Sequence, residues 1–167
     1  ERMIDEETDL IQFIQDHQDD FYRFCYSYVK DSTMAMDIVQ DAIVKAIENY
    51  SRLRKKEYIK TWFYRIMINE CKLYLRKRKN YESFNEQEIS QKQMDINTVL
   101  GVQQVMQNLP VQYKDIVYLR YYEDMTLEEI SLTLHINMST IKSRLYKALK
   151  MMRVDLEKDK GCGYNER

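Results

Sequence analysis

Hydrophobic residues recur at steps of three and four positions along most of this 167-residue chain. That spacing puts apolar side chains on one face of an α-helix, whereas a strand would alternate apolar and polar residues. Only three glycines and one proline interrupt the pattern, so there are few signals for strand turns. The pattern predicts an all-α protein with helices over residues 8–29, 34–50, 61–79, 99–122 (interrupted at Pro110), 126–134 and 139–153.

Several helix ends carry residue types that satisfy free backbone groups at a helix terminus. Short polar side chains precede helices, and one Ser/Thr-x-x-Glu spacing is that of a capping box. The residues expected to cap or begin helices are Ser32 or Thr33, Pro110, Thr126 with Glu129, and Asn137 or Ser139.

The same periodicity predicts which side chains are buried. In the helix over 34–50, two neighbouring apolar rows form one stripe, and polar residues occupy the opposite side. The rows are Ile38, Ala42 and Ala46, then Val39, Ile43 and Ile47. In the last helix, the row expected to face a core is Ile141, Leu145, Leu149 and Met152.

Residues 80–98 are polar and have no sustained period, which favours a boundary between two domains. We therefore expect two small helical domains joined by a flexible linker. Their predicted bounds are 1–80 and 99–155, with 81–98 as the linker and 156–167 as a tail.

Charge is distributed unevenly, although the formal net charge is only −1. Residues 52–79 hold eleven Lys and Arg, and the only acids there are Glu57 and Glu70. A second basic block, residues 139–153, has five Lys and Arg and no acid. Two such blocks, about sixty residues apart, suggest two contact points on an extended polyanion. The alternative is two helix faces that merely contact solvent.

The second basic block belongs to a helix-turn-helix pattern. A capped helix, a three-residue break and a cationic amphipathic helix are what that motif requires, and its second helix lies in the DNA major groove. An ordinary helical hairpin is the alternative, and a membrane-surface helix is less favoured because bulky aromatics are missing from the apolar face. Residues expected to reach base edges are Thr140, Lys142, Ser143, Arg144, Tyr146 and Lys147, with Lys150 and Arg153 on phosphates.

Other kinds of chemistry have little support. The two histidines are far apart, no Gly-rich phosphate loop occurs, and Cys25, Cys71 and Cys162 lack the spacing of metal ligands. No apolar run approaches the length of a membrane span, and the acidic N-terminus is not that of a secretory signal. We expect a cytoplasmic protein with reduced thiols, no metal, no cofactor, no direct membrane insertion and no enzymatic activity.

Three stretches, in order, resemble bacterial RNA polymerase sigma factors of the extracytoplasmic-function (ECF) group of the sigma-70 family. The stretch "DIVQDAIVKA" is similar to the family's core-polymerase-binding helix. The stretch "TWFYRIMINECKLYLRKRK" is similar to the helix that reads and melts the minus-ten promoter element. The stretch "LPVQYKDIVYLRYYEDMTLEEISLTLHINMSTIKSRLYKALKMMR" resembles the family's promoter-binding C-terminal domain. The resemblance as a whole covers about residues 8–153. Two positions depart from the family's pattern. His135 stands in the turn where the family often has Gly, Asp or another small polar residue, and Ser131 stands where a helix-turn-helix often has Ala.

The resemblance implies roles for named residues. It implies that core polymerase is bound by Asp37, Gln40, Asp41, Ile43 and Lys45. It implies minus-ten contacts by Lys56, Tyr58, Trp62, Arg65, Asn69, Lys72 and Arg76. Lys55, Lys56 and Tyr58, from the loop before the helix, are the weaker candidates. Aromatics such as Trp62 and Tyr64 beside cations suit single-stranded DNA, because bases stack on rings while phosphates meet charge. The alternative for Trp62 is a place in the core.

The resemblance further implies a transcription initiation factor that binds core RNA polymerase and directs it to promoters. It would recognise minus-thirty-five duplex DNA and melt the minus-ten element. It also implies an anti-sigma partner, usually anchored in the membrane. Two alternatives stay open: a dimeric helix-turn-helix regulator that binds an operator, and a helical adaptor that binds only protein.

Overall fold

The computed structural model describes residues 2–84, 105–106 and 108–161, and every regular element among them is a helix. The all-α prediction is therefore confirmed for the described chain. The chain divides into two compact units, Glu1–Gln87 and Glu88–Arg167.

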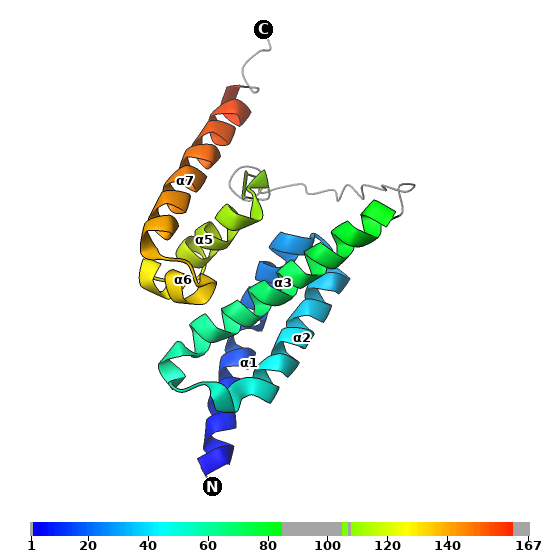
Figure 1. The fold of residues 1–167 in the computed structure, drawn as a ribbon, viewed down its shortest axis with the longest axis vertical. Helices are drawn as coiled ribbons and strands as arrows, with labels where there is room; N and C mark the ends of the chain where they lie inside the picture. Colours follow the sequence, from blue (N-terminus) through cyan, green and yellow to red (C-terminus); the bar gives the residue numbers. More distant parts are fainter. Residues whose placement is uncertain (1, 85–104, 107, 162–167) are drawn as a thin grey trace. The chain divides into compact units, whose positions relative to one another are not determined.

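Unit 1 is a bundle of three helices (Figure 1). They are α1 (Arg2–Val29), α2 (Ser32–Asn49) and α3 (Ile59–Phe84), and α2 and α3 are joined through two short 3₁₀ turns, Tyr50–Arg52 and Lys56–Tyr58. Each helix packs against the other two. Hence α2 and α3 lie side by side and can share a surface.

Aromatic rings fill the core of unit 1. The ring centroids of Phe21 and Phe63 are 4.4 Å apart, and those of Phe24 and Tyr64 are 5.4 Å apart. All four side chains are fully buried. Tyr64 was expected among the aromatics that face DNA, and that expectation is wrong because its ring packs edge-on against α1.

The turn between α1 and α2 uses a different cap from the one expected. Lys30 has a φ of 54°, which ends α1, and the side chain of Asp31 accepts a hydrogen bond from the Met34 amide at 3.0 Å. The N-cap of α2 is thus Asp31, not Ser32 or Thr33. A carboxylate at this position also interacts favourably with the helix dipole.

The buried face of α2 is narrower than its apolar stripe. The residues buried there are Ala35, Ile38, Val39, Ala42 and Ala46. The predicted burial of Ile47 is wrong, because 53% of this residue is exposed. Periodicity marks an apolar arc, whereas the positions of α1 and α3 decide which part of that arc is covered.

Two helices extend past their predicted ends. α3 continues to Phe84, four residues into the range expected as a linker, and α7 (Met138–Gly161) continues into the range expected as a tail. Lys, Arg and Glu are good helix formers, so a helix can continue after its apolar stripe has ended. None of the described helices is long and apolar enough to cross a membrane. The remainder of the predicted linker and tail lies outside the described residues.

Unit 2 contains α5 (Val111–Tyr121), α6 (Leu127–Leu134) and α7, and α7 packs on both of the others. Pro110 stands at the N-cap of α5, one position before the first turn. Ile116, Leu119 and Ile130 are fully buried. From α7, Ile141 and Met152 are buried and Leu145 is half-buried, as the predicted row requires. Leu149 departs from that row because it is 40% exposed, and Ala148 is buried in its place.

The helix-turn-helix of unit 2 has the predicted caps. The Glu129 amide donates to Thr126 Oγ1 at 3.2 Å, and the Thr126 amide donates to Glu129 Oε2 at 2.7 Å, which completes the capping box. Asn137 Oδ1 accepts from the Thr140 amide at 2.9 Å and so caps α7. Between the helices, His135 adopts the left-handed conformation with φ 54° and ψ 44°.

Because His135 has a Cβ in the left-handed region, its backbone is strained, and glycine would remove that strain. We expect His135→Gly to raise the free energy of unfolding by about 0.5–1 kcal/mol, measured by urea denaturation. His135→Ala, which keeps the Cβ, is the control and should give no gain. An equal gain from both variants would mean that loss of the imidazole ring, and not relief of backbone strain, is the cause.

Candidate nucleic-acid interface

Most of the predicted groove-binding side chains share one exposed face of α7. Lys142, Ser143, Lys147 and Lys150 are exposed, and Tyr146 is 71% exposed. Their spacing puts them opposite the buried side of the helix. Thr140 is half-buried at the border of this face. We call the set Lys142, Ser143, Tyr146, Lys147 and Lys150 the α7 face.

Arg144 lies differently from the α7 face. It is half-buried and interacts electrostatically with Asp115 of α5, a residue with only 2% exposure. Burial raises the pKa of the Asp115 carboxyl to about 7, and the Arg144 guanidinium opposes that rise. Arg144 therefore links α7 to α5 as well as standing beside the α7 face.

Unit 1 has a pocket of about 280 Å³ between α2 and α3. It brings together Trp62 and Asn69, both predicted for minus-ten contacts, with Lys45, which was predicted for polymerase. Sequence reasoning missed the other lining residues, which are Asn49, Arg52, Ile66 and Glu70. One signal for Glu70 was present, since it is one of only two acids within the first basic block.

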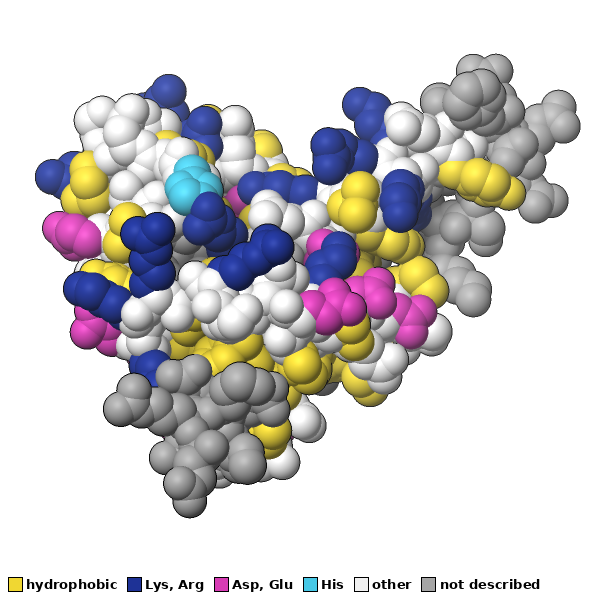
Figure 2. Space-filling model, turned by 60° about the horizontal axis from the view of Figure 1, so that its bottom comes forward, with side chains coloured by type: hydrophobic (Ala, Val, Ile, Leu, Met, Phe, Trp, Pro, Cys, Tyr) yellow, Lys and Arg dark blue, Asp and Glu magenta, His cyan; other side chains and the backbone are white. Residues whose placement is uncertain are grey.

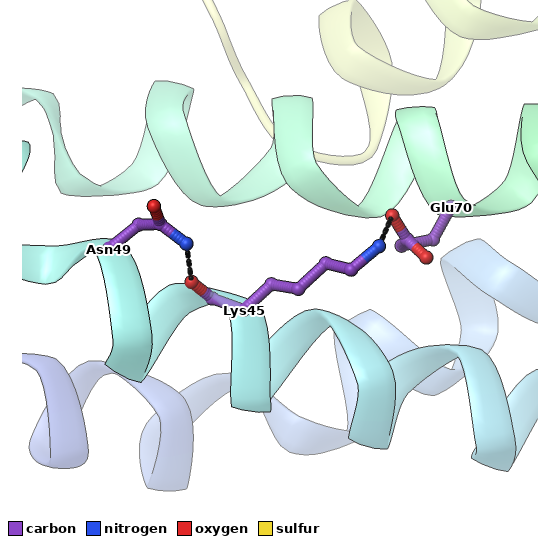
Figure 3. Close-up of polar contacts among 3 residues, drawn as sticks. All are labelled: Lys45, Asn49 and Glu70. Atoms are coloured by element: carbon purple, nitrogen blue, oxygen red, sulfur yellow. Dashed lines mark hydrogen bonds and ion pairs between the residues drawn. The ribbon is translucent and has the colours of Figure 1, made fainter.

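An ion pair between two of the lining residues joins α2 to α3 (Figure 3). Lys45 Nζ lies 2.5 Å from Glu70 Oε1, and the Asn49 side chain donates to the Lys45 carbonyl at 2.9 Å. The Glu70 side chain is only 12% exposed and that of Lys45 is 47% exposed. Lys45 is exposed, as expected for the polar side of α2, and its ammonium group also reaches Glu70 of α3.

The loop before α3 is tied down by its own charges. Lys56 Nζ lies 2.5 Å from Asp9 Oδ2 of α1, and Lys55 Nζ is 3.6 Å from Glu57 Oε1. The same Lys55 ammonium lies 5.8 Å from the centroid of the Tyr58 ring. These contacts leave Tyr58 41% exposed at the start of α3.

The outer side of α3 continues the cationic surface. Asn69 and Arg76 are exposed, whereas Arg65 and Lys72 are half-buried. Trp62 is also half-buried, with its ring centroid 6.2 Å from that of Tyr50. Trp62 therefore belongs neither to the central core nor wholly to the surface, and part of its ring borders the pocket.

A third surface lies on the outer side of α2. Asp37, Gln40 and Asp41 are exposed, and Ile43 is half-buried. Beside them, Met36, Val44 and Ile47 are each a little over half exposed. The combination of acids and uncovered apolar side chains differs from the α7 face and from α3. We call these seven residues the α2 surface.

Figure 2 shows Lys and Arg side chains over much of the visible face, with acids in smaller groups and apolar side chains between them. Within the described residues, no three His, Cys, Asp or Glu side chains are grouped as metal ligands. Cys25 and Cys71 are buried with their sulfur atoms 3.8 Å apart. The hydrogen bond between them and burial raise the pKa of the Cys25 thiol, which makes it a poor nucleophile.

Comparison with known families accounts for both units. The Sigma-70 region 2 model matches residues 13–81, and the Sigma-70, region 4 model matches residues 100–152. The chain is 40% identical over 153 residues to RNA polymerase sigma factor SigV of Bacillus subtilis, covering 90% of this chain and 92% of that protein. It is 25% identical over 158 residues to the ECF RNA polymerase sigma factor SigW of the same organism, covering 84% of each.

Two solved structures share the fold. One is the sigma factor RpoE in complex with the anti-sigma factor NepR from Bartonella quintana, with a TM-score of 0.75, 20% identity, and coverage of 90% of this chain and 97% of that one. The other is CnrH in complex with the cytosolic domain of CnrY, with a TM-score of 0.67, 17% identity, and coverage of 90% and 88%. This chain belongs to the sigma-70 family of RNA polymerase sigma factors, in the ECF group.

The buried Asp115 makes a pH-dependent contribution to stability. Its pKa rises from 3.8 to about 7 on folding, so between these values the folded chain holds a proton that the unfolded chain has lost. The resulting stabilisation is complete below about pH 4 and is lost as the pH rises towards 7. Asp115→Asn stays neutral and removes this dependence.

We expect hydrogen exchange in α5 and α7 to become faster in the wild type than in Asp115→Asn as the pH rises from 5 to 8, after correction for intrinsic rates. The corresponding difference in opening free energy is about 2–4 kcal/mol. Asp124→Asn, an exposed carboxyl in the same unit, is the control. A difference between wild type and Asp115→Asn that does not change with pH would contradict the account.

Proposed function

We propose that the two units divide promoter recognition between them. Unit 1 opens the minus-ten element and unit 2 reads the minus-thirty-five element, while the α2 surface holds core RNA polymerase. The observation that carries this proposal is the separation of three chemically different surfaces: the cationic α7 face, the cationic side of α3 with its pocket, and the acidic and apolar α2 surface.

In unit 2, α7 enters the major groove. Lys142, Ser143, Tyr146 and Lys147 contact base edges, since Lys donates to guanine acceptors and Ser can serve either base of a pair. Lys150 and Arg153, further along the helix, contact phosphates and give affinity without sequence information. Thr140 and Arg144 stand at the edge of this contact, and Arg144 also interacts electrostatically with Asp115.

In unit 1, the side of α3 that carries Arg65, Lys72 and Arg76 follows the DNA backbone. The resemblance to the family assigns the capture of an extruded minus-ten base to the loop before α3 and to Asn69. The pocket beside Asn69 supplies a place for that base, with Trp62 as a ring on which it can stack. Extrusion costs a few kcal/mol, which such contacts offset.

The α2 surface suits a protein partner better than DNA. Exposed Met36, Val44 and Ile47 offer apolar area, whereas Asp37 and Asp41 would repel phosphates. Lys45 contributes less to this contact than its place in the resemblance implies, because its ammonium group pairs with Glu70.

The proposal includes an anti-sigma factor, anchored in the membrane, that covers these surfaces and holds the chain inactive in the cytoplasm. Both structural relatives named above are in complexes, one with an anti-sigma factor and one with a cytosolic domain. The chain itself performs no catalytic step, since the polymerase forms the phosphodiester bonds. A dimeric operator-binding regulator is not favoured, because it leaves the region 2 match over residues 13–81 without a role.

Run-off transcription with purified core polymerase and a promoter library tests the proposal. Promoter-specific transcripts should arise only when this chain is added. An adaptor or an operator-binding regulator would give no promoter-specific transcript. The absence of such transcripts would overturn the proposed function.

Removal of one cation from the α7 face should weaken promoter binding and reduce its salt dependence. We expect Lys150→Ala to reduce the magnitude of the slope of log K against log salt concentration by about 1, since one phosphate contact is lost and one fewer counterion is released. The measurement is filter binding of the assembled polymerase to duplex promoter. Arg23→Ala removes an exposed cation from α1 and is the matched control. An unchanged slope for Lys150→Ala would exclude that residue from a phosphate contact.

A separate prediction concerns the binding of core polymerase by the α2 surface. We expect Asp41→Ala to weaken binding to core polymerase about fivefold, because a charged contact at an interface is typically worth about 1 kcal/mol. The measurement is fluorescence anisotropy with labelled protein. Asp20→Ala, from an exposed pair on α1, is the control. Equal affinities for the two variants would place the polymerase contact elsewhere.

A further inference from the structure

Glu70 is the one acidic residue that lines the pocket between α2 and α3. A carboxylate is out of place on a surface that approaches DNA, because it repels phosphates. The side chain is also only 12% exposed, so it is held in the wall of the pocket and does not extend into solvent. Its position therefore requires an explanation that a general cationic surface does not provide.

Lys45 compensates the charge of Glu70 and restricts its orientation. The 2.5 Å contact joins Lys45 Nζ to one carboxylate oxygen, Oε1 (Figure 3). The hydrogen bond from Asn49 to the Lys45 carbonyl involves the same turns of α2. A partly buried ion pair of this kind fixes the carboxylate more firmly than an exposed pair would.

Among the described residues, no hydrogen bond or ion pair reaches the second carboxylate oxygen, Oε2. An ionised carboxylate can only accept hydrogen bonds. The pocket therefore presents one oriented, charged acceptor beside the amides of Asn49 and Asn69 and the ring of Trp62. The ligand that complements this acceptor is a planar base with an N–H₂ group on its edge.

We propose that Glu70, positioned by Lys45, selects the base extruded into the pocket by accepting a hydrogen bond from its exocyclic amine. Adenine, cytosine and guanine carry such an amine, whereas the one N–H donor on the pairing edge of thymine, N3–H, lies between two carbonyl oxygens that a carboxylate repels. The pocket thus discriminates against thymine. This inference rests on the proposed function, and it makes Lys45 a positioning residue for DNA recognition.

The test varies each minus-ten base of a promoter recovered from the library and measures the rate of open-complex formation. With the wild type, one position should show thymine to be slower than the best amine-bearing base by roughly tenfold, the worth of one charge-assisted hydrogen bond. Glu70→Gln keeps the shape of the side chain but can also donate to a carbonyl. At that position it should reduce the discrimination to less than about threefold, with affinity for core polymerase unchanged.

Lys45→Met separates the roles of the two residues. It keeps an unbranched chain but leaves the Glu70 carboxylate uncompensated beside DNA. Open-complex formation should then fall with all four bases, and the double variant with Glu70→Gln should recover the rate of Glu70→Gln alone. Asp20→Asn, which removes an exposed acid from α1, should leave the order of the four bases unchanged.

Two results would overturn the inference while the proposed function stands. One is Glu70→Gln with the same order and spread of the four bases as the wild type. The other is a Glu70→Gln variant that forms open complexes more slowly by the same factor with all four bases and also has a lower melting temperature. That result would make Glu70 purely structural. Failure of the wild type to give a promoter-specific transcript with any base would instead overturn the proposed function, and this inference with it.

Discussion

The packing of Phe63 and Tyr64 against α1 decides which side of α3 faces outward. Their rings lie 4.4 Å from Phe21 and 5.4 Å from Phe24, measured between centroids. Loss of a buried aromatic of this kind typically costs about 3–5 kcal/mol, whereas an exposed ion pair contributes at most about 1 kcal/mol. The aromatic contacts therefore set the rotation of α3, and its cations and Asn69 take the side that remains.

The same constraint explains why α2 and α3 can serve different partners. Small residues, Ala42 and Ala46 among them, let α2 lie close to its neighbours, and the outer acids and apolar side chains remain uncovered. At the seam between the two helices, the Lys45–Glu70 pair closes one wall of the pocket. A contact between α2 and α3 thus belongs to the side proposed to bind DNA, although Lys45 is carried by the helix proposed to hold polymerase.

Local patterns made much of this fold predictable. The capping box of Thr126 and Glu129 and the Asn137 cap connect residues three apart, so the sequence contains both partners within one turn. The exposed cations of α7 also follow from periodicity. Ile47 and Leu149 show the limit, since an apolar residue at the border of a stripe is buried only if a neighbouring helix reaches it.

Contacts between distant residues could not be predicted in this way. Lys45 and Glu70 are 25 positions apart, and Arg144 is linked to Asp115 of another helix. Such pairs depend on how the helices are rotated against each other, which the core decides. The candidate DNA-binding residues were therefore identifiable from the sequence. The pocket, and the interactions of Lys45 with Glu70 and of Arg144 with Asp115, could be found only in the structure.

The central claim is that one chain presents two DNA-binding surfaces that act together on polymerase. Permanganate footprinting tests this most directly, because it modifies thymines that have left the double helix. The account predicts reactive thymines in the minus-ten region only when promoter, core polymerase and this protein are all present, with protection of the minus-thirty-five duplex in the same complex. Symmetric protection of duplex DNA by the protein alone, without reactive thymines, would contradict it.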